Sequence, residues 1–598
     1  MSTLTEKKTD LKGGEFLIKE SNAADTYIKE QITEEQSMIA QSTSDFIANR
    51  VHPVIKEIDK QQPGLVVGLL HEIAELGLLG AAIPEEYGGM GVDFATDTFI
   101  NIEMGKGHSF SAAYAAHTGI GTLPILYFGT EEQKKKYLPG LGDSSIKASY
   151  CLTEPGSGSD ALGAKTKAVL SEDGKHYIIN GQKMWITNAG FADLFTVFAK
   201  IDGEKFTGFI IDAKTEGISL GAEEDKLGIK GSSTRQVFFN NVKVPVENVL
   251  GEIGKGHKIA FNVLNIGRYK LGVLALGGAK ETTTTAIKYA NERIQFNVPI
   301  SSFGAIKHKL AEMAIKTYAT DAATFRTAGL IQDYIDAAVA KGVDKVQAKL
   351  QAAEEFSVEC AILKVFGSEV LDYVVDEAVQ VFGGTGFSEE YPVARAYRDS
   401  RINRIFEGTN EINRLLSVGM LVKKAMKGEL DLFTPAMAVQ KELMSVPDFS
   451  TPDADDVFGN ERKALLNAKK AILMTAGAAV QKFMQNLEKE QEVMMDIADM
   501  LIELFVCEST LLKTEKLISI RGAEACALQI DITKTYISDS LERINLSGKH
   551  AIVSFNDGDM LRIMLMGLKR FTKLEPVNTV AARRRIADKL IEEGQYCF

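Results

Sequence analysis

The chain of 598 residues has few cysteines, one tryptophan and no long apolar run. Its five cysteines are scattered without CxxC spacing, which argues against a disulfide framework and a zinc site; they are Cys151, Cys360, Cys507, Cys526 and Cys597. No apolar run approaches the length that crosses a bilayer, and residues 1–22 resemble neither a secretory signal nor a transit peptide. We therefore expect a cytoplasmic protein without a metal site.

An excess of basic residues is also lacking. The sequence has 80 acidic and 68 basic residues, a net charge of -12, so it shows no general nucleic-acid footprint. Its 45% apolar and 25% charged content is typical of globular proteins. At this length we expect more than one domain.

Changes in hydrophobic period divide the chain into helical and β regions. The dipeptide Asn180-Gly181 indicates an antiparallel middle domain, because Asn-Gly between two apolar runs predicts a two-residue hairpin turn. Three further runs are expected strands, Leu194–Ala199, Phe206–Ile211 and Gln236–Val244. The predicted parts are a flexible tail (1–33), a helical domain (34–147), a β-domain (148–255), a helical domain (256–428), a linker (429–460) and a further helical domain (461–598).

The stretch from Arg404 to Ile412 carries the candidate catalytic residue. Glu407 follows Phe406 and precedes an apolar-periodic run, so it lies on the turn that leads into a helix, for which Asn410 is the predicted N-cap. A helix start can bind an anion such as a pyrophosphate. Dehydration beside an aromatic ring raises the pKa of a carboxyl, so Glu407 is a candidate general base. The alternative is an exposed loop glutamate beside an N-cap.

Three other stretches suggest a site for a flat ligand. Cys151–Gly163 is rich in glycine and hydroxyl groups, Trp185-Ile186-Thr187 sets an indole near a hydroxyl, and Gln380–Phe387 places glycines at a helix end. Taken singly, each has a simpler interpretation: a turn without a ligand, a core tryptophan, and a helix C-cap.

Together, these stretches resemble the signatures of the acyl-CoA dehydrogenase family. Cys151–Gly163 resembles its first signature and Gln380–Asp399 its second; Arg293–Phe296 resembles its Arg-x-x-Phe-Gly motif, with Asn297 in place of the glycine. The resemblance covers about residues 35–425. It implies an α+β fold with an N-terminal helical domain, a middle antiparallel β-barrel-like domain and a C-terminal four-helix bundle, followed here by an additional helical domain.

The resemblance also implies FAD as cofactor and acyl-CoA as substrate. The residues expected to hold the isoalloxazine ring are Leu152, Thr153, Trp185, Ile186 and Thr187. Those expected at the ADP part, in this family partly from a neighbouring subunit, are Arg293, Gln295, Gln380, Gly383 and Gly384, completed by Thr409 and Asn410. Those expected to contact acyl-CoA are Ser159, Asn265, Arg268 and Phe406.

The implied reaction is α,β-dehydrogenation of acyl-CoA to trans-2-enoyl-CoA in fatty acid β-oxidation. The family places its base either at the loop glutamate or before the substrate arginine; here Gly267 precedes Arg268, so the resemblance assigns the α-proton to Glu407. The hydride would pass to flavin N5, and an electron-transfer flavoprotein would accept the electrons. Two alternatives stay open: an acyl-CoA oxidase that uses oxygen, and a non-catalytic assembly or scaffold relative.

The C-terminal extension of about 170 residues resembles the very-long-chain branch of the family. That branch implies a long-chain substrate and a homodimer, whereas medium-chain relatives are homotetramers. Gly119 and Gly121 resemble the small residues at the base of its acyl tunnel, although Pro124 could narrow the cavity. The segment Lys427–Glu461, which matches a basic membrane contact in relatives, is acidic here, so we expect no membrane contact.

Overall fold

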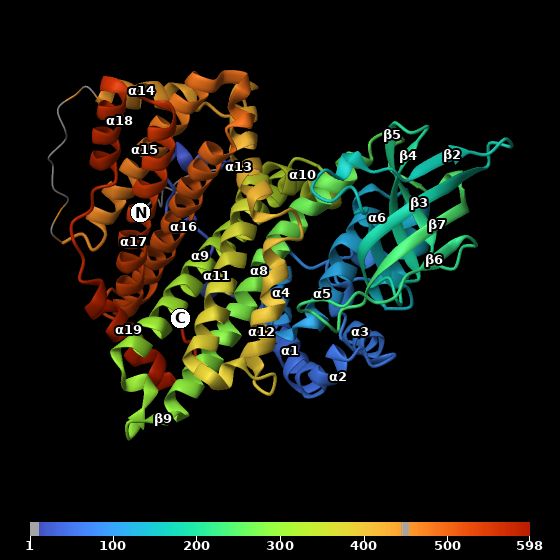
Figure 1. Ribbon diagram of the computed structural model, residues 1–598, viewed down its shortest axis with the longest axis horizontal. Helices are drawn as coiled ribbons and strands as arrows, with labels where there is room; N and C mark the ends of the chain where they lie inside the picture. The colour runs from blue at the N-terminus through green and yellow to red at the C-terminus, as the bar shows by residue number, and fades with distance from the viewer. Residues whose placement is uncertain (1–10, 444, 446–452, 454) are drawn as a thin grey trace, which may run out of the picture.

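The computed structural model describes residues 11–443, 445, 453 and 455–598. Figure 1 shows a sheet on the right, a bundle of long helices in the centre and the C-terminal helices on the left. The order along the chain is helices, sheet, helices and further helices. This is the predicted α+β arrangement with an additional C-terminal helical region.

The N-terminal region consists of short helices with well-capped starts. At α1, the Thr33 hydroxyl accepts from the Gln36 N–H while the Gln36 side chain accepts from the Thr33 N–H. Thr130 and Gln133 form the same capping box at α7. The helices are α1 (Glu34–Phe46), α2 (Ile55–Asp59), α3 (Leu65–Glu75), α4 (Phe94–Met104), α5 (Ser109–Ala116), α6 (Leu123–Phe128) and α7 (Glu131–Gly142).

The prediction of a flexible tail over residues 1–33 is wrong for residues 11–33. Phe16, Leu17 and Ile28 are almost fully buried, the first two in the core shared by the central bundle and the C-terminal helices. Isolated apolar residues in a polar stretch give no period, which is why the sequence did not indicate this packing. Residues 1–10 lie outside the described residues.

The middle region is an open mixed sheet, which corrects the predicted antiparallel, barrel-like domain. The strand order is β6-β7-β3-β2-β4-β5-β8, and β1 also pairs with β4. The β1–β4 and β2–β4 pairs are parallel. Within the described residues β6 and β8 do not pair, so the sheet does not close. The strands are β1 (Ala148–Cys151), β2 (Lys167–Leu170), β3 (His176–Thr187), β4 (Leu194–Ile201), β5 (Lys205–Asp212), β6 (Ile218–Leu220), β7 (Thr234–Pro245) and β8 (Val249–Leu250).

The predicted hairpin turn at Asn180-Gly181 is also wrong, because β3 runs through both residues. β3 pairs with β7 with a register shift between Ile179 and Gly181 and a second between Lys183 and Ile186. A local bulge in a continuous strand therefore takes the place of a chain reversal. Gly181 is required there because an added Cβ would lie 2.4 Å from the Thr166 hydroxyl oxygen.

The central bundle is formed by long helices of which α11 contacts α8, α9 and α13. These four are the predicted bundle; shorter helices join them, and a small hairpin of β9 (Ile294–Gln295) and β10 (Val298–Pro299) follows α8. The helices are α8 (Gly256–Glu292), α9 (Gly304–Ala340), α10 (Lys345–Glu355), α11 (Ser357–Phe382), α12 (Pro392–Ser400) and α13 (Asn410–Met426).

The C-terminal helices share one hydrophobic core with the bundle. Part of the predicted linker is helical, namely α14, whereas residues 444, 446–452 and 454 lie outside the described residues. Among the described helices, none combines the length and apolar character needed to cross a membrane. The helices are α14 (Phe433–Leu443), α15 (Gly459–Phe483), α16 (Gln491–Arg521), α17 (Ala527–Phe555), α18 (Gly558–Phe571) and α19 (Thr579–Glu593).

Candidate active site

The loop that carries Glu407 joins α12 to α13 in a strained conformation. Glu407 and Gly408 both have positive φ, +58° and +80°. A left-handed backbone is rare for a residue with a side chain and persists only where surrounding contacts hold it. Thr409 caps α13, because its hydroxyl accepts the Ile412 N–H at 3.2 Å. The predicted N-cap at Asn410 is therefore wrong by one residue.

The Asn410 side chain turns toward α11 instead of capping the helix. Its Oδ1 accepts from Lys364 Nζ at 2.6 Å, and its Nδ2 donates to Ser368 and Glu369 at 3.0 Å each. Lys364 Nζ also donates to the carbonyl of Gly408 at 2.7 Å. Because protein groups engage the buried Asn410 side chain at both ends, we assign it to holding the loop rather than to contacting a cofactor.

One oxygen of the Glu407 carboxyl group, Oε2, is buried and has no hydrogen-bond partner among the described residues. Burial raises the pKa of Glu407 to about 7, while the nearby cations of Arg268 and Lys364 act in the opposite direction. The expectation of a raised pKa is thus confirmed. A carboxyl that ionises near neutrality and has a free oxygen is suited to accept a proton from a ligand.

A cavity of about 170 Å³ lies beside Glu407. Its lining follows one face of α8 from Gly267 to Thr282, which are 15 positions or about 22 Å of helix apart. An added Cβ at Gly267 would lie 2.7 Å from Glu407 Oε2, so the glycine leaves room for the carboxyl. Small and apolar residues from α5 and the turn after it line another side: Ala112, Ala115, Ala116, Gly119 and Ile120.

The residues predicted at the isoalloxazine ring lie on neighbouring segments. Trp185 is 52% exposed and has a φ of +60° at the second register shift of β3, so the bulge turns the indole out of the sheet. Lys183 Nζ donates to the Leu152 carbonyl at 3.1 Å, which ties the glycine-rich loop to β3. The set brought together is Leu152, Thr153, Trp185, Ile186 and Thr187; Thr187 also lines the cavity.

Three of the four residues predicted to contact acyl-CoA lie near Glu407. Arg268 and Asn265 are buried and joined by a hydrogen bond of 2.7 Å, and Arg268 Nε donates to the Glu407 carbonyl at 3.3 Å. Phe406 lines the cavity. Ser159 lies on an exposed loop and is not among the lining residues.

Five of the seven residues predicted at the ADP part lie at the far end of the bundle, whereas Thr409 and Asn410 belong to the start of α13 beside Glu407. Arg293 follows Arg268 by 25 positions, and the helix between them is about 37 Å long. All five of these residues are exposed, and they are Arg293, Gln295, Gln380, Gly383 and Gly384. A single chain therefore does not bring the two halves of the predicted FAD site together.

Two buried lysines near the site were missed from the sequence. Lys364 is a lone cation in the apolar stretch Val358–Phe366, a signal that could have marked it as a buried, paired charge. Lys183 forms an ion pair of 2.7 Å with Glu154 beneath the glycine-rich loop. The groups that pair with these two lysines are distant in sequence or on another segment, so only the fold identifies those partners.

Comparison with known proteins identifies the family over nearly the whole chain. Models of the acyl-CoA dehydrogenase N-terminal, middle and C-terminal domains match residues 33–144, 149–242 and 254–419, and another acyl-CoA dehydrogenase C-terminal domain model matches 467–570. A probable acyl-CoA dehydrogenase of Bacillus subtilis is 46% identical over 594 residues, covering 99% of this chain and 100% of that protein.

Two further comparisons agree. The human mitochondrial very long-chain specific acyl-CoA dehydrogenase is 39% identical over 411 residues, which cover 65% of this chain and 60% of that protein. A crystal structure of an acyl-CoA dehydrogenase complexed with FAD from Bacillus anthracis is 47% identical, with a TM-score of 0.95 over 98% of this chain and 100% of that one. The chain therefore belongs to the acyl-CoA dehydrogenase family of FAD-dependent oxidoreductases.

Proposed function

We propose that this enzyme converts acyl-CoA to trans-2-enoyl-CoA with Glu407 as the base that removes the α-proton. The observation that carries the proposal is the buried Oε2 of Glu407, which lacks a hydrogen-bond partner in the described residues, on a side chain that lines the cavity. A pKa of about 7 leaves a large ionised fraction near neutrality while keeping the carboxylate basic enough to accept a proton. The α-proton of a thioester is far too weakly acidic for a carboxylate to remove it in water, so the site must also stabilise the negative charge that develops on the substrate.

The backbone of the same residue supplies that stabilisation. The N–H of Glu407 donates to no group within the described residues, so it is free to donate to the thioester oxygen. A fixed donor aimed at an oxygen on which negative charge develops lowers the barrier to proton removal. Arg268 Nε donates a hydrogen bond to the backbone carbonyl of Glu407, so the other backbone polar group of this residue is also fixed. The loop thus orients the base and the polarising donor as one unit.

The residues present fit FAD. Trp185 presents an exposed indole beside the Leu152–Thr153 segment, and added Cβ atoms at Gly383 and Gly384 would meet nothing within 4 Å. We assign the ring to the first group of residues and the ADP part to the second, in a homodimer in which each site takes Arg293 and its neighbours from the partner. When bound, FAD supplies the acceptor for the β-hydrogen.

We propose a preference for long acyl chains. The cavity follows α8 for about 22 Å, and Ala112, Ala116 and Gly119 place little side-chain volume in it. Gly121 and Pro124 are not among the lining residues, so the narrowing expected from Pro124 has no support. A series of saturated acyl-CoA thioesters, assayed with a ferricenium acceptor, should give the highest kcat/KM for long chains; a maximum at butyryl-CoA would contradict the assignment.

We assign the enzyme to fatty acid β-oxidation in the cytoplasm, with an electron-transfer flavoprotein as acceptor. The rival acyl-CoA oxidase differs in the fate of the reduced flavin. Reduction by acyl-CoA without oxygen, followed by admission of air, should give slow reoxidation of the product-bound flavin. Fast reoxidation, at the rate of turnover, would identify an oxidase.

The variant Glu407→Gln tests the base. The amide keeps the side-chain volume and the backbone N–H, so acyl-CoA should still bind and perturb the flavin spectrum. The amide cannot accept the α-proton, so we expect flavin reduction to slow by about 10,000-fold, the upper end of what a general base contributes. Stopped-flow measurement of flavin bleaching under anaerobic conditions gives this rate.

Two further variants complete the test. Glu411→Gln removes an exposed carboxylate on the first turn of α13 and should leave the rate unchanged. Glu407→Gly combined with Gly267→Glu moves the carboxylate to the facing position on α8 and should restore part of the rate, because Cβ at 267 lies next to the present position of Oε2. Bleaching of Glu407→Gln at nearly the wild-type rate would show that another group is the base.

A further inference from the structure

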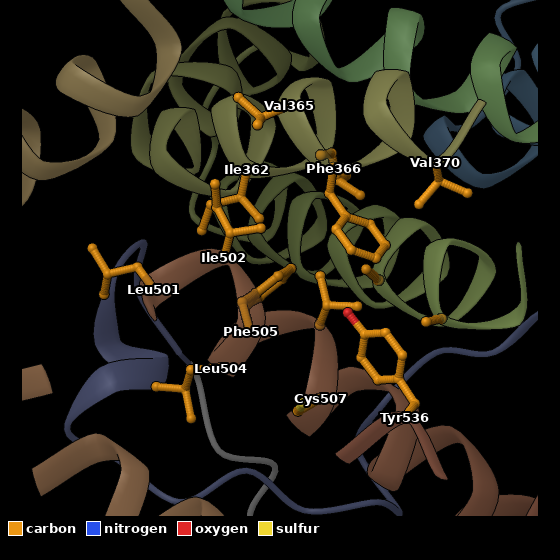
Figure 2. Close-up of a cluster of buried hydrophobic side chains, with 14 of the residues drawn as sticks. Ile362, Val365, Phe366, Val370, Leu501, Ile502, Leu504, Phe505, Cys507 and Tyr536 are labelled. Atoms are coloured by element: carbon orange, nitrogen blue, oxygen red, sulfur yellow. The ribbon is translucent and has the colours of Figure 1, made fainter. Parts of the chain in front are cut away.

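The C-terminal helices make an apolar contact with the helix bundle that carries the active site. Figure 2 shows Ile362 and Phe366 of α11 facing Ile502 and Phe505 of α16, all within one hydrophobic core. α16 also contacts α9 and α13. Since the Glu407 loop leads directly into α13, the extra domain packs on the helix that continues from the candidate base.

A polar contact also joins α13 to α16. Arg414 of α13 donates from Nη1 and Nη2 to both carboxylate oxygens of Glu369 on α11, at 2.7 and 3.0 Å. Its Nε donates to Asp499 Oδ1 on α16 at 2.7 Å. The Arg414 side chain is 13% exposed, so the planar guanidinium is held on two sides in a largely buried setting.

The contact continues to the catalytic loop. Glu369 Oε1, which accepts from Arg414 Nη1, also accepts from Asn410 Nδ2 at 3.0 Å. Asn410 Oδ1 accepts from Lys364, and Lys364 donates to the carbonyl of Gly408, the residue after Glu407. An unbroken series of hydrogen bonds therefore runs from the extra domain to the strained loop.

We propose that Asp499 is a positioning residue through which the C-terminal domain holds the Glu407 loop in its reactive conformation. The inference rests on the proposed role of Glu407. The left-handed backbone at Glu407 and Gly408 needs outside contacts to persist. Without the negative charge of Asp499, Arg414 is bound strongly only by Glu369; it can then rotate and draw that carboxylate away from Asn410, and the loop loses part of its support. Small displacements of a catalytic group are costly to the rate.

Asp499→Asn is the test, because its side chain is partly exposed and the change keeps its size. The matched control is Glu312→Gln, which removes a carboxylate paired with Arg583 between α9 and α19 at 2.6 Å, across the same boundary but away from α13. For Asp499→Asn we expect single-turnover flavin reduction to slow by about 3- to 30-fold, with KM for acyl-CoA and flavin content unchanged. The control should reduce its flavin at the wild-type rate.

Two more measurements separate positioning from general stability. Glu369→Gln combined with Asp499→Asn should lose less rate than the two single losses multiplied, since both act through Arg414. Hydrogen exchange of residues 405–412 should be faster in Asp499→Asn and unchanged in Glu312→Gln. This readout does not depend on the reaction, so a wrong assignment of the base and a wrong assignment of Asp499 are distinguished. Equal exchange in the two variants, or equal slowing of flavin reduction, overturns the inference.

Discussion

At the scale of single residues, the basicity of Glu407 is a balance between burial and two cations. Arg268 faces the carboxyl from α8 and Lys364 from α11, and both lower its pKa, whereas burial raises it to about 7. Tyr150 of β1 adds a buried hydroxyl nearby. Because Coulombic interactions are strong in a partly dehydrated site, removing either cation should change the pH at which the enzyme becomes active.

Lys364→Met tests this balance. Burial lowers the pKa of Lys364 itself to about 7, so its charge acts on Glu407 mainly at and below neutrality. The change removes that charge while keeping an unbranched chain, so we expect the pKa of Glu407 to rise above 7. Only the ionised form accepts a proton, and the rise of kcat/KM with pH should therefore move to higher pH, with the largest loss of activity below the wild-type midpoint. The pH profile of kcat/KM reports the free enzyme and is the measurement required. Lys364→Arg carries the charge throughout this pH range and should leave the midpoint at or below the wild-type value; an equal upward shift in both variants would contradict the assignment.

Which residues of the site the sequence could predict depends on how local their signals are. Glu407, Phe406 and Arg268 lie in short characteristic patterns, and the structure places them together. Thr409 caps α13 in place of the predicted Asn410, because the Asn410 side chain accepts a hydrogen bond from Lys364, 46 positions away. Such a partner cannot be read from neighbouring residues, so the support of the loop needs the fold.

At the scale of elements, the segment before α1 is fixed by backbone hydrogen bonds to α10 and α11. The N–H groups of Gly13 and Gly14 donate to the carboxylates of Glu355 and Glu359 at 2.9 and 2.7 Å. Lys424 of α13 donates to the Gly13 carbonyl at 3.1 Å. The segment is thus joined to the far end of the helix that carries the catalytic loop.

Gly13→Ala should detach this segment. An added Cβ would lie 1.9 Å from the Glu355 carbonyl oxygen, so the backbone must move and the buried contacts of Phe16 weaken. We expect the free energy of unfolding to fall by about 2 kcal/mol or more, measured by denaturant unfolding. Gly68→Ala in α3, where an added Cβ meets nothing within 4 Å, is the control and should stabilise the protein by about 0.5–1 kcal/mol. Equal stability of the two variants would show that the segment does not depend on this contact.

How well the sequence predicts a helix or strand depends on the length of its periodic pattern. The long helices follow a sustained apolar period, and the expected strand at Phe206–Ile211 lies within β5. The parallel pairs of β4 with β1 and β2 join strands that are not neighbours in sequence and leave no local signal, so the sequence alone predicts an antiparallel sheet. The Asn-Gly pair predicts a turn, whereas pairing with β7 along both halves keeps β3 a single continuous strand with two bulges.

At the scale of the whole molecule, the two ends of the predicted FAD site point to a second copy of the chain. The ring-binding residues lie near Glu407, while Arg293 lies about 37 Å further along α8. Phe296 and Phe387 lie beside the distal set and are 87% and 91% exposed. Large apolar side chains so exposed in these positions are suited to a subunit interface. We therefore expect each complete site to take its distal half from the partner.

Co-expression of two defective chains tests this arrangement. One chain carries Glu407→Gln and lacks the base; the other carries Arg293→Glu and should repel the pyrophosphate. Each homodimer alone should be inactive. In the mixed dimer, the intact Glu407 of one chain meets the intact Arg293 of the other, so one of its two sites is complete. Random pairing makes half the dimers mixed, and total activity should reach about a quarter of wild type. If every site were built from one chain, neither chain would hold both groups, and co-expression would restore no activity. Mixing the two purified homodimers without subunit exchange should also give none, which controls for activity that arises outside a shared dimer.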